Sequence, residues 1–430
     1  MIIGVDDTDS NEGMCTTYLG ALLLKELQVY GTLEPFPLLV RLNPTIPHKT
    51  RGNAAIALKI ETDFPEKVIE HVISRIEELA HLECEKTNPG AVFILESTNN
   101  YKDLKPILWS FLEEAVRHVV EIETAEKLIS DFNIHAKGFK NGRGLIGALA
   151  ACGAMLNLEK WDPTYEYLAY RQIDKCGTLR ELEKASFFEA DKATYPETWD
   201  TVDLVNKVVV CIPHSGDPVL YGIRGENPEV VHRAANVIRG EKKKDFAIYR
   251  TNQGTDMHLI SAIGISEIQD MHSYKLEGRV LTPPRTLEGG HVIFSVQDEE
   301  GKKLDCAAFE PTKNFRALIR KLLPGDKIEV SGSVGSRTLN IEKIEIKKLI
   351  PVYIEENPKC PACNKHMKSA GKGQGFRCKK CGMKADSKIR SEKKRDLKIG
   401  LYEVPPCARR HLAKPLIREK RSDIQIYPSR

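Results

Sequence analysis

The hydrophobic pattern of the first 270 residues alternates between strand-like and helix-like segments. The run IIGV is followed by a polar loop and then by TTYLGALLLKEL, whose apolar residues recur at helical spacing. LLVRLNP and NAAIALKI lie on either side of the turn-rich PTIPHKTRG, which predicts a hairpin-like pair of strands. A helix is expected over residues 64–82, a strand at AVFIL, and further helices over residues 104–131. This alternation predicts an α/β or α+β region of two interleaved units over residues 1–270.

The pattern changes after residue 270. Residues 274–350 contain three β-rich runs, a helix near FRALIRKLL and two more β-rich runs, an order typical of an OB-fold β-barrel. Residues 357–385 are rich in Gly, Lys and Cys and predict a small metal-stabilised ribbon. Residues 386–430 form a basic tail that we expect to be disordered until a partner orders it. The sequence therefore predicts an α+β multidomain protein.

Composition and charge narrow the class of protein. The 430 residues are 41% hydrophobic and 29% charged, which is ordinary for a soluble protein. We find neither a membrane-spanning run of roughly 20 apolar residues nor a basic leader, so a cytoplasmic location is expected. Residues 351–430 hold 21 Lys and Arg against 8 Asp and Glu, whereas residues 1–350 hold 43 against 52. This asymmetry suggests a polyanionic partner, although a solvated charged face would look the same.

Three carboxylates, Asp6, Asp7 and Asp9, crowd into four positions after the first predicted strand. Like charges this close raise one another's pKa unless a cation neutralises them. The hydroxyls of Thr16 and Thr17 follow at the start of the next helix, where threonine commonly serves only as a helix cap. The segment therefore predicts a cation site with a hydroxyl beside it.

A second cluster surrounds Gly142, Gly144 and Gly147, spaced as G-x-G-x-x-G at the opening of an apolar helix. Glycines here allow backbone N–H groups to approach a phosphate, but small residues also allow a helix to pack closely on a sheet. Four potential cations beside the glycines favour phosphate binding: His135, Lys137, Lys140 and Arg143. Farther along, Asp217 lies in an HSGDP turn that either faces a cleft or is only a turn.

Two CxxC pairs, Cys360 with Cys363 and Cys378 with Cys381, predict one structural zinc ion. A redox CxxC would be single and would lie beside a βαβ unit. Lysines and arginines around the four thiols suggest that the ribbon also contacts phosphates.

Taken in order, GVDDTDS, GMCTTYLG, KGFKNGRGLIGALAA, HSGDPVLYGIRGE, the OB-fold and the paired CxxC motifs resemble the archaeal tRNA agmatidine (2-agmatinylcytidine) synthetase family. The resemblance covers essentially the whole chain. It implies an ATP-dependent ligase that joins agmatine to the wobble cytidine of the minor isoleucine tRNA. It also implies a kinase-like domain beside a ferredoxin-like domain.

The resemblance assigns roles to the candidate residues. Asp6, Asp7 and Asp9 would hold Mg²⁺, and Lys137, Gly142, Arg143 and Gly144 would bind the ATP phosphates. A threonine of the GMCTTYL segment is phosphorylated by the enzyme itself in the family, and the motif maps that role to Thr17, with Thr16 as the alternative. Asp217 is our choice for the guanidinium end of agmatine.

Two other functions are compatible with parts of the sequence. A metal-dependent phosphoesterase would use the same aspartates without an amine substrate. A non-catalytic RNA-binding protein would use only the OB-fold and the ribbon, which leaves the aspartates and the Gly-rich loop without a purpose. The sequence alone does not determine the oligomeric state.

Overall fold

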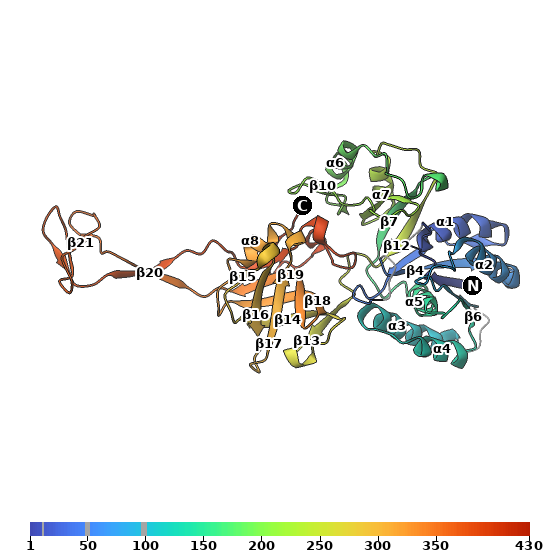
Figure 1. Ribbon diagram of the computed structural model, residues 1–430, viewed down its shortest axis with the longest axis horizontal. Helices are drawn as coiled ribbons and strands as arrows, with labels where there is room; N and C mark the ends of the chain where they lie inside the picture. Colours follow the sequence, from blue (N-terminus) through green and yellow to red (C-terminus); the bar gives the residue numbers. More distant parts are fainter. Residues whose placement is uncertain (11–12, 48–51, 96–100) are drawn as a thin grey trace.

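The computed structural model describes residues 1–10, 13–47, 52–95 and 101–430 (Figure 1). A ten-stranded sheet organises the first 260 residues, and its spatial order is β6-β5-β1-β4-β3-β12-β7-β11-β8, with β2 on β4. The strands are β1 (Ile2–Asp6), β2 (Thr32–Leu33), β3 (Leu38–Arg41), β4 (Ala54–Glu61), β5 (Gly90–Ile94), β6 (His135–Gly138), β7 (Thr164–Tyr170), β8 (Thr198–Trp199), β11 (Val219–Gly225) and β12 (Asp245–Thr251). The predicted hairpin-like pair is confirmed, since β3 and β4 are antiparallel neighbours.

Helices cover both faces of the β6-to-β3 half of this sheet. They are α1 (Thr16–Glu26) and α2 (Pro65–Leu79) on one face, and α3 (Tyr101–Arg117), α4 (Ile122–Asp131) and α5 (Gly144–Leu156) on the other. Helix α5 is apolar on all sides and every one of its residues is buried, because it lies between the sheet and α3. A Cβ on Gly4 of β1 would lie 2.1 Å from the Ala148 carbonyl oxygen, which shows how closely α5 approaches the central strand.

The other half of the sheet begins at β12, which pairs with β3 in parallel. Strands β12, β7, β11 and β8 are then antiparallel neighbours. Helices α6 (Lys184–Thr194) and α7 (Pro228–Ala235) cover this half, where Phe187 and Val231 pack with the strand residues Tyr167 and Tyr221. A short separate pair, β9 (Val202–Asp203) and β10 (Val208–Val209), lies beside α6.

A closed β-barrel follows the large sheet. Strand β14 pairs with β16 and β18, and β19 joins β17 to β18, so the five strands close in the order β14-β16-β17-β19-β18. Their bounds are β14 (Ser273–Val280), β16 (Val292–Gln297), β17 (Lys303–Ala308), β18 (Lys327–Gly335) and β19 (Thr338–Lys348). Helix α8 (Phe315–Ile319) lies between the third and fourth of these strands in the chain, as the sequence predicts.

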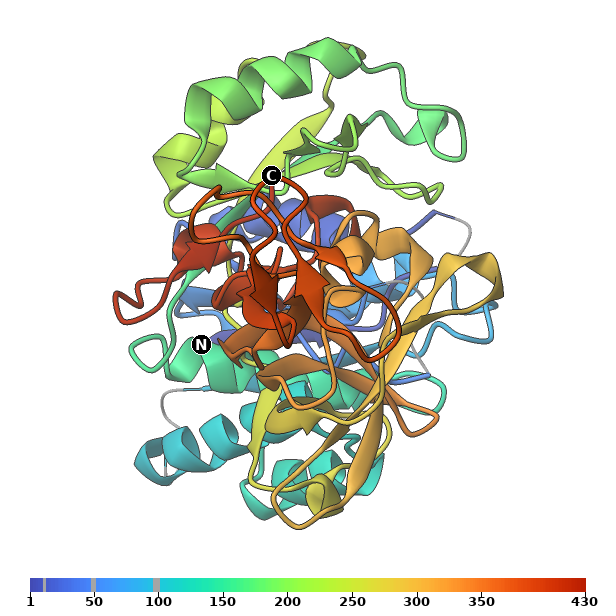
Figure 2. The ribbon, with the colours of Figure 1, turned by 90° about the vertical axis from the view of Figure 1, so that its left-hand side faces the viewer.

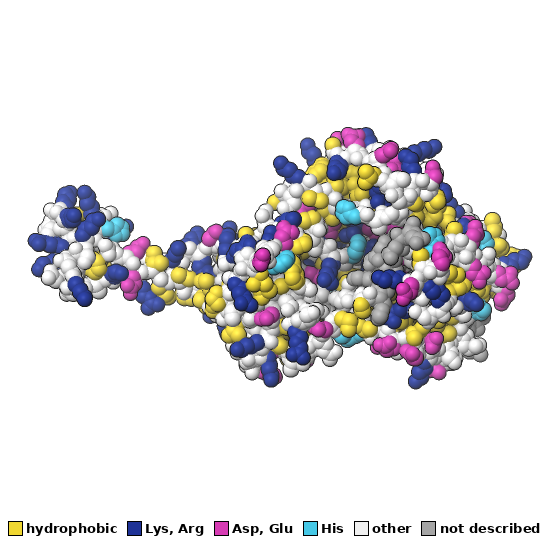
Figure 3. Space-filling model, in the orientation of Figure 1, with side chains coloured by type: hydrophobic (Ala, Val, Ile, Leu, Met, Phe, Trp, Pro, Cys, Tyr) yellow, Lys and Arg dark blue, Asp and Glu magenta, His cyan; other side chains and the backbone are white. Residues whose placement is uncertain are grey.

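A two-stranded stalk carries the cysteine ribbon away from the body (Figure 1). The stalk consists of β20 (Val352–Glu356) and β24 (Ile389–Lys393), and the ribbon of β21 (Lys368–Ser369), β22 (Phe376–Arg377) and β23 (Lys384–Ala385). Seen along its long axis, the molecule shows the ribbon in front of the barrel (Figure 2). Lysines and arginines gather on the ribbon and stalk with few acidic side chains among them, whereas side chains of both signs lie on the body (Figure 3).

The expectation of a disordered tail is wrong. After β24, strand β25 (Gly400–Glu403) adds to β19 of the barrel, and β26 (Ile426–Tyr427) pairs with β25. Between them, residues 404–425 pack on the body: Leu412 is 1% exposed in the core beneath the large sheet, and Arg409 pairs with Asp200 and Glu403. The basic composition predicted disorder, but apolar residues and internal ion pairs lie among the basic residues of this segment and hold it on the body. In the described ranges, no helix is both long and apolar enough to cross a membrane.

Candidate functional site

The three aspartates lie where β1 ends and the chain turns toward α1. Asp7 adopts a left-handed backbone conformation with φ of 56°, and its amide donates a hydrogen bond of 2.7 Å to Oδ1 of Asp6. Burial and the neighbouring Asp7 raise the pKa of Asp6 well above its usual value. Burial and Asp9 raise the pKa of Asp7 to about 7. This local electrostatic environment favours a bound cation, because ionising both buried carboxylates without one is costly.

The Gly-rich loop packs against this aspartate loop. Helix α5 begins at Gly144, and a Cβ there would lie 2.4 Å from the Gly90 amide nitrogen. A Cβ on Gly147 would lie 1.8 Å from Oδ2 of Asp6, and Gly142 has a φ of 70°. Gly144 and Gly147 therefore allow α5 to pack closely on its neighbours, which is one of the two interpretations of this motif. It brings the first turn of α5 to the carboxylates.

A cavity of about 60 Å³, the first cavity, joins the two motifs. Asp6, Asp7, Asp9, Thr16 and Arg143 line it together with Gly147. Arg143 also lowers the pKa of Asp6 and Asp7, although burial outweighs this effect.

The other predicted cations lie outside the lining of the first cavity. The Lys137 ammonium lies 5.5 Å from the centre of the Phe139 ring, on the exposed edge strand β6. Lys140 donates hydrogen bonds to the carbonyl oxygens of Cys84 and Glu85, and the His135 ring packs edge-on against Phe93. Of the four predicted cations, only Arg143 lines the first cavity among the described residues, while the Lys140 ammonium lowers the pKa of Asp7 from outside the lining.

The two threonines have different surroundings. The Thr16 hydroxyl donates a hydrogen bond of 3.0 Å to Oδ1 of Asp9 and accepts one of 3.0 Å from the Thr8 hydroxyl. The Thr17 hydroxyl lies 3.1 Å from Sγ of Cys15. The N-cap position of α1 is occupied by Cys15, and the Asp9 carboxylate accepts the hydrogen bond of the Thr16 amide. Asp9, and neither threonine, therefore caps the helix.

A larger cavity of about 350 Å³, the second cavity, lies on the other side of Thr16. Both cavities are lined by Asp9, Thr16, Gly52 and Ala54, whereas Thr17 lines only the second. Asp9 and Thr16 therefore form part of a wall shared by an acidic cavity and a mixed-charge cavity.

Charged side chains of the second cavity come from distant parts of the chain. Glu166 of β7 accepts hydrogen bonds from Arg224 of β11 at 3.2 Å and from Gln253, while Arg41 of β3 lies 3.9 Å away. Arg224 also donates a hydrogen bond of 2.8 Å to Nδ1 of His411, which belongs to the segment we expected to be disordered. Sequence reasoning missed these four charged or titratable residues, because each is a single polar position without a recognisable spacing.

Asp217 also lines the second cavity, within the turn after residue 212. Its carboxylate accepts a hydrogen bond of 2.9 Å from the Val219 amide and one from the Ser215 hydroxyl. The Arg180 guanidinium pairs with it at 3.3 Å. The cleft-facing and turn interpretations of this residue are therefore compatible with each other.

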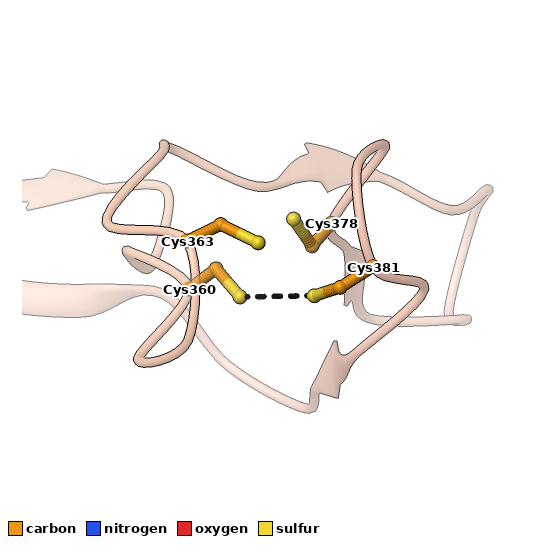
Figure 4. Close-up of side chains that lie close together, drawn as sticks. All are labelled: Cys360, Cys363, Cys378 and Cys381. Carbon is orange, nitrogen blue, oxygen red and sulfur yellow. Dashed lines mark hydrogen bonds between the residues drawn. The ribbon is translucent and has the colours of Figure 1, made fainter.

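The four ribbon cysteines converge at one point (Figure 4). Their sulfur atoms all lie within 4.8 Å of one another, and Sγ of Cys360 lies 3.3 Å from Sγ of Cys381. Tetrahedral zinc bound at about 2.3 Å to each thiolate requires sulfur atoms at about this separation. Backbone N–H groups of Cys381 and Lys380 lower the pKa of Cys378 to about 6, whereas burial raises the pKa of Cys360 and the hydrogen bond with Cys381 raises that of Cys363. The four side chains thus fit a structural zinc ion.

Comparisons with known proteins agree along the whole chain. Three family models match: the TiaS TCKD domain over residues 2–141, the TiaS FLD domain over residues 142–258 and the TiaS C-terminal zinc ribbon domain over residues 357–397. The chain is 71% identical to the tRNA(Ile2) 2-agmatinylcytidine synthetase TiaS of Methanosarcina acetivorans over 430 residues, 100% of both proteins.

Solved structures of such enzymes are similar over the same extent. A TiaS–tRNA(Ile2)–ATP complex matches with a TM-score of 0.86 at 47% identity, covering 99% of both chains. A TiaS–tRNA(Ile2)–AMPCPP–agmatine complex matches with a TM-score of 0.84 at 44% identity, covering 99% of this chain and 98% of that one. The resemblance inferred from the motifs is confirmed, and the chain belongs to the family of archaeal tRNA(Ile2) 2-agmatinylcytidine synthetases.

Proposed function

We propose that the two adjoining cavities carry out the successive steps of the family's reaction. The protein is an ATP-dependent tRNA-modifying enzyme that conjugates agmatine to the cytidine of tRNA(Ile2). The observation that carries the mechanism is the shared wall: Asp9 and Thr16 face the aspartate-lined cavity on one side and the larger cavity on the other.

The first cavity is assigned to ATP. Asp6 and Asp7, together with Asp9, would hold Mg²⁺, because this ion prefers oxygen ligands. The raised pKa values of Asp6 and Asp7 show that their ionised forms are unfavourable unless a cation neutralises them. Bound Mg²⁺ would neutralise negative charge on the phosphates during transfer. Arg143 is assigned to the phosphates. Gly142 and Gly144 stay predicted phosphate ligands, although their amides already donate hydrogen bonds to the carbonyl oxygens of Phe139 and Asn88.

Lys137 stays a predicted phosphate ligand, and its position on β6 requires it to reach the nucleotide from outside the first cavity.

The second cavity is assigned to the cytosine and agmatine. In the first step, the cytosine 2-oxygen forms a bond to phosphorus while the bond from phosphorus to the donor oxygen, on the nucleotide or on the phosphorylated threonine, breaks, and the donor oxygen keeps that electron pair. In the second step, the primary amine of agmatine attacks carbon 2 and the carbon–oxygen bond breaks. Phosphate leaves with the electron pair and takes up one amine proton. Phosphorylation thus converts a poor leaving group into a good one.

Thr17 is our choice for the residue that the enzyme phosphorylates, because it lines the cavity to which the phosphoryl group must pass. Thr16 is the alternative, and its hydrogen bond to the Asp9 carboxylate would allow Asp9 to take the hydroxyl proton. Asp217 is retained for the agmatine guanidinium. Arg180 also pairs with this carboxylate. Since Asp217 would bind the guanidinium end of agmatine and not the reacting amine, we expect Asp217→Asn to raise the KM for agmatine more than it lowers kcat.

We assign each part of the chain to a domain with its own role in the reaction. We assign residues 1–270 to the catalytic region, in which a kinase-like domain is interleaved with a ferredoxin-like domain. The packing of α5 on β1, β4 and β5 supports interleaving. We assign the closed barrel over residues 274–350 to the OB-fold and residues 357–385 to the zinc ribbon, both as surfaces for the tRNA.

The experiment combines radiolabelled ATP, agmatine and a tRNA(Ile2) transcript, and measures label on the protein and agmatine in the RNA. We expect both in the wild type and neither in Asp7→Asn, while the exposed Asp63→Asn serves as the control. A phosphoesterase would release phosphate without joining agmatine to RNA, and a non-catalytic RNA-binding protein would bind the transcript without consuming ATP. Either result in the wild type would refute the proposal.

A further inference from the structure

Arg41 is a largely buried cation with few partners. It ends strand β3, only 14% of its side-chain surface is exposed, and burial lowers its pKa. Its Nε atom is shielded from solvent and has no hydrogen-bond partner in the described part of the chain. Its guanidinium lies 3.9 Å from the Glu166 carboxylate, which is too far for a hydrogen bond. A buried guanidinium with an unused donor is costly unless a ligand completes its bonding.

The neighbouring acidic groups are already shared. Glu166 accepts hydrogen bonds from Arg224 and Gln253. Asp200, which lies 3.6 Å from Arg224, also pairs with Arg409. The carboxylate closest to Arg41 is therefore already shared with other donors, so Glu166 does not use up the hydrogen-bonding capacity of the Arg41 guanidinium.

The position of the Arg41 guanidinium in the second cavity indicates which ligand it binds. Arg41 and Arg224 line the same cavity as Thr16 and Thr17. A guanidinium presents planar, paired donors that match the oxygen atoms of a phosphate group. We propose that Arg41, with Arg224 beside it, forms a phosphate-binding subsite in the second cavity that holds the phosphoryl group after it has left ATP.

This inference rests on the proposed function for the identity of the bound group, but not for the existence of an anion site. The same chemistry could serve a backbone phosphate of the tRNA. The transferred phosphoryl group is favoured because the subsite shares a cavity with both hydroxyls, whose wall adjoins the aspartates. Arg41 then stabilises the charge of the phosphoryl group, whether on threonine or on the cytosine oxygen.

Arg250 offers a matched control. It lies on β12, the strand paired with β3, and its Nε is also buried without a hydrogen-bond partner among the described residues. However, Arg250 stacks on Trp161 and donates to the Leu158 carbonyl oxygen, and it lines neither cavity. Arg250→Gln therefore removes a similar buried cation without touching the subsite.

The test compares Arg41→Gln, Arg41→Lys and Arg250→Gln with the wild type, after thermal melting has identified the folded variants. Calorimetry with inorganic phosphate alone measures the subsite directly. We expect at least tenfold weaker phosphate binding in Arg41→Gln, partial recovery in Arg41→Lys, and wild-type binding in Arg250→Gln. Equal phosphate affinity in the wild type and a folded Arg41 variant would overturn the proposal.

Activity measurements separate the two sources of phosphate. Without tRNA, label on the protein should fall by about 100-fold in Arg41→Gln, the usual cost of removing one group that stabilises transferred charge. Affinity for tRNA(Ile2) should stay within twofold. Weaker tRNA binding with normal protein labelling would assign Arg41 to the RNA backbone and overturn the proposal. If the wild type itself takes no label and makes no product, the proposed function fails, while the calorimetric result still decides whether the subsite exists.

Discussion

Replacing Asp7 by asparagine removes a half-buried carboxylate beside the buried Asp6 while conserving the local structure. Asparagine tolerates the left-handed backbone at this position, where alanine would add strain. Its side-chain oxygen can still accept the hydrogen bond of 3.2 Å from the Asn88 amide. The variant therefore isolates the effect of charge at the end of β1.

The size and sign of the effect follow from the raised pKa. Asp7 titrates at about 7 in the folded protein, against about 3.9 when unfolded. Below about pH 4 the carboxyl is protonated in both states and costs nothing. Between about pH 4 and 7 the folded state is increasingly penalised, and above pH 7 the penalty is complete. Three pKa units correspond to about 4 kcal/mol, which we reduce to about 2 kcal/mol because water reaches the cavity.

The assay is urea unfolding of the wild type and Asp7→Asn at pH 4.5 and pH 8, in EDTA. We expect nearly equal free energies of unfolding at about pH 4.5 and a variant about 2 kcal/mol more stable at about pH 8. Mg²⁺ with a non-hydrolysable ATP analogue at about 100 times its Kd should add about 2.7 kcal/mol to the wild type. It should add much less to the variant, so the order of stability reverses.

Two results would contradict this reasoning. A stability difference that is constant from pH 4.5 to pH 8 would show that Asp7 carries no electrostatic penalty. Equal stabilisation of both proteins by Mg²⁺ and the nucleotide would show that the cation binds elsewhere.

The other predictions concern the acceptor, the zinc ion and the C-terminal segment. Thr17→Val should abolish protein-bound label at a stability cost of about 1 kcal/mol, and loss of label in Thr16→Val alone would transfer the role to that residue. Cys378→Ser should remove zinc, measured by elemental analysis, and weaken tRNA binding while the melting of the body is unchanged. Leu412→Ala should lower the free energy of unfolding by about 2–4 kcal/mol, whereas no change would mean that this segment is not part of the core.

The parts of the fold that the sequence predicts well are those with a local signal. The strand, loop and helix around Asp7, the glycines at the start of α5 and the order of strands in the barrel all depend on spacing within a few tens of residues. The ribbon cysteines are likewise recognisable from two short motifs. In each case the residues that cooperate are neighbours in the chain, or repeat a pattern with a physical cause.

The residues that line the second cavity form no such local pattern in the sequence. Four residues from distant parts of the chain meet in this cavity: Arg41, Glu166, Arg224 and His411. They meet because β3 pairs in parallel with β12, because β7 and β11 come next in the sheet, and because the C-terminal segment packs on the body. Pairing of strands so distant in sequence leaves no periodicity to read. Lys137 is close in sequence to the Gly-rich loop, but its side chain does not line the first cavity, so its role at the phosphates stays a prediction.

The order in which the cavity walls are made has a consequence for biosynthesis. Arg41 leaves the ribosome early, whereas His411, which contacts Arg224, is made almost a whole chain later. At about 5–20 residues per second this interval is roughly 20–70 s. During that time β1, β4 and β5 can already pair, but the core surface that Leu412 covers is bare and the second cavity lacks a wall. A nascent chain can thus complete the first cavity well before the second, and in the meantime the apolar surface that Leu412 later covers is exposed to solvent.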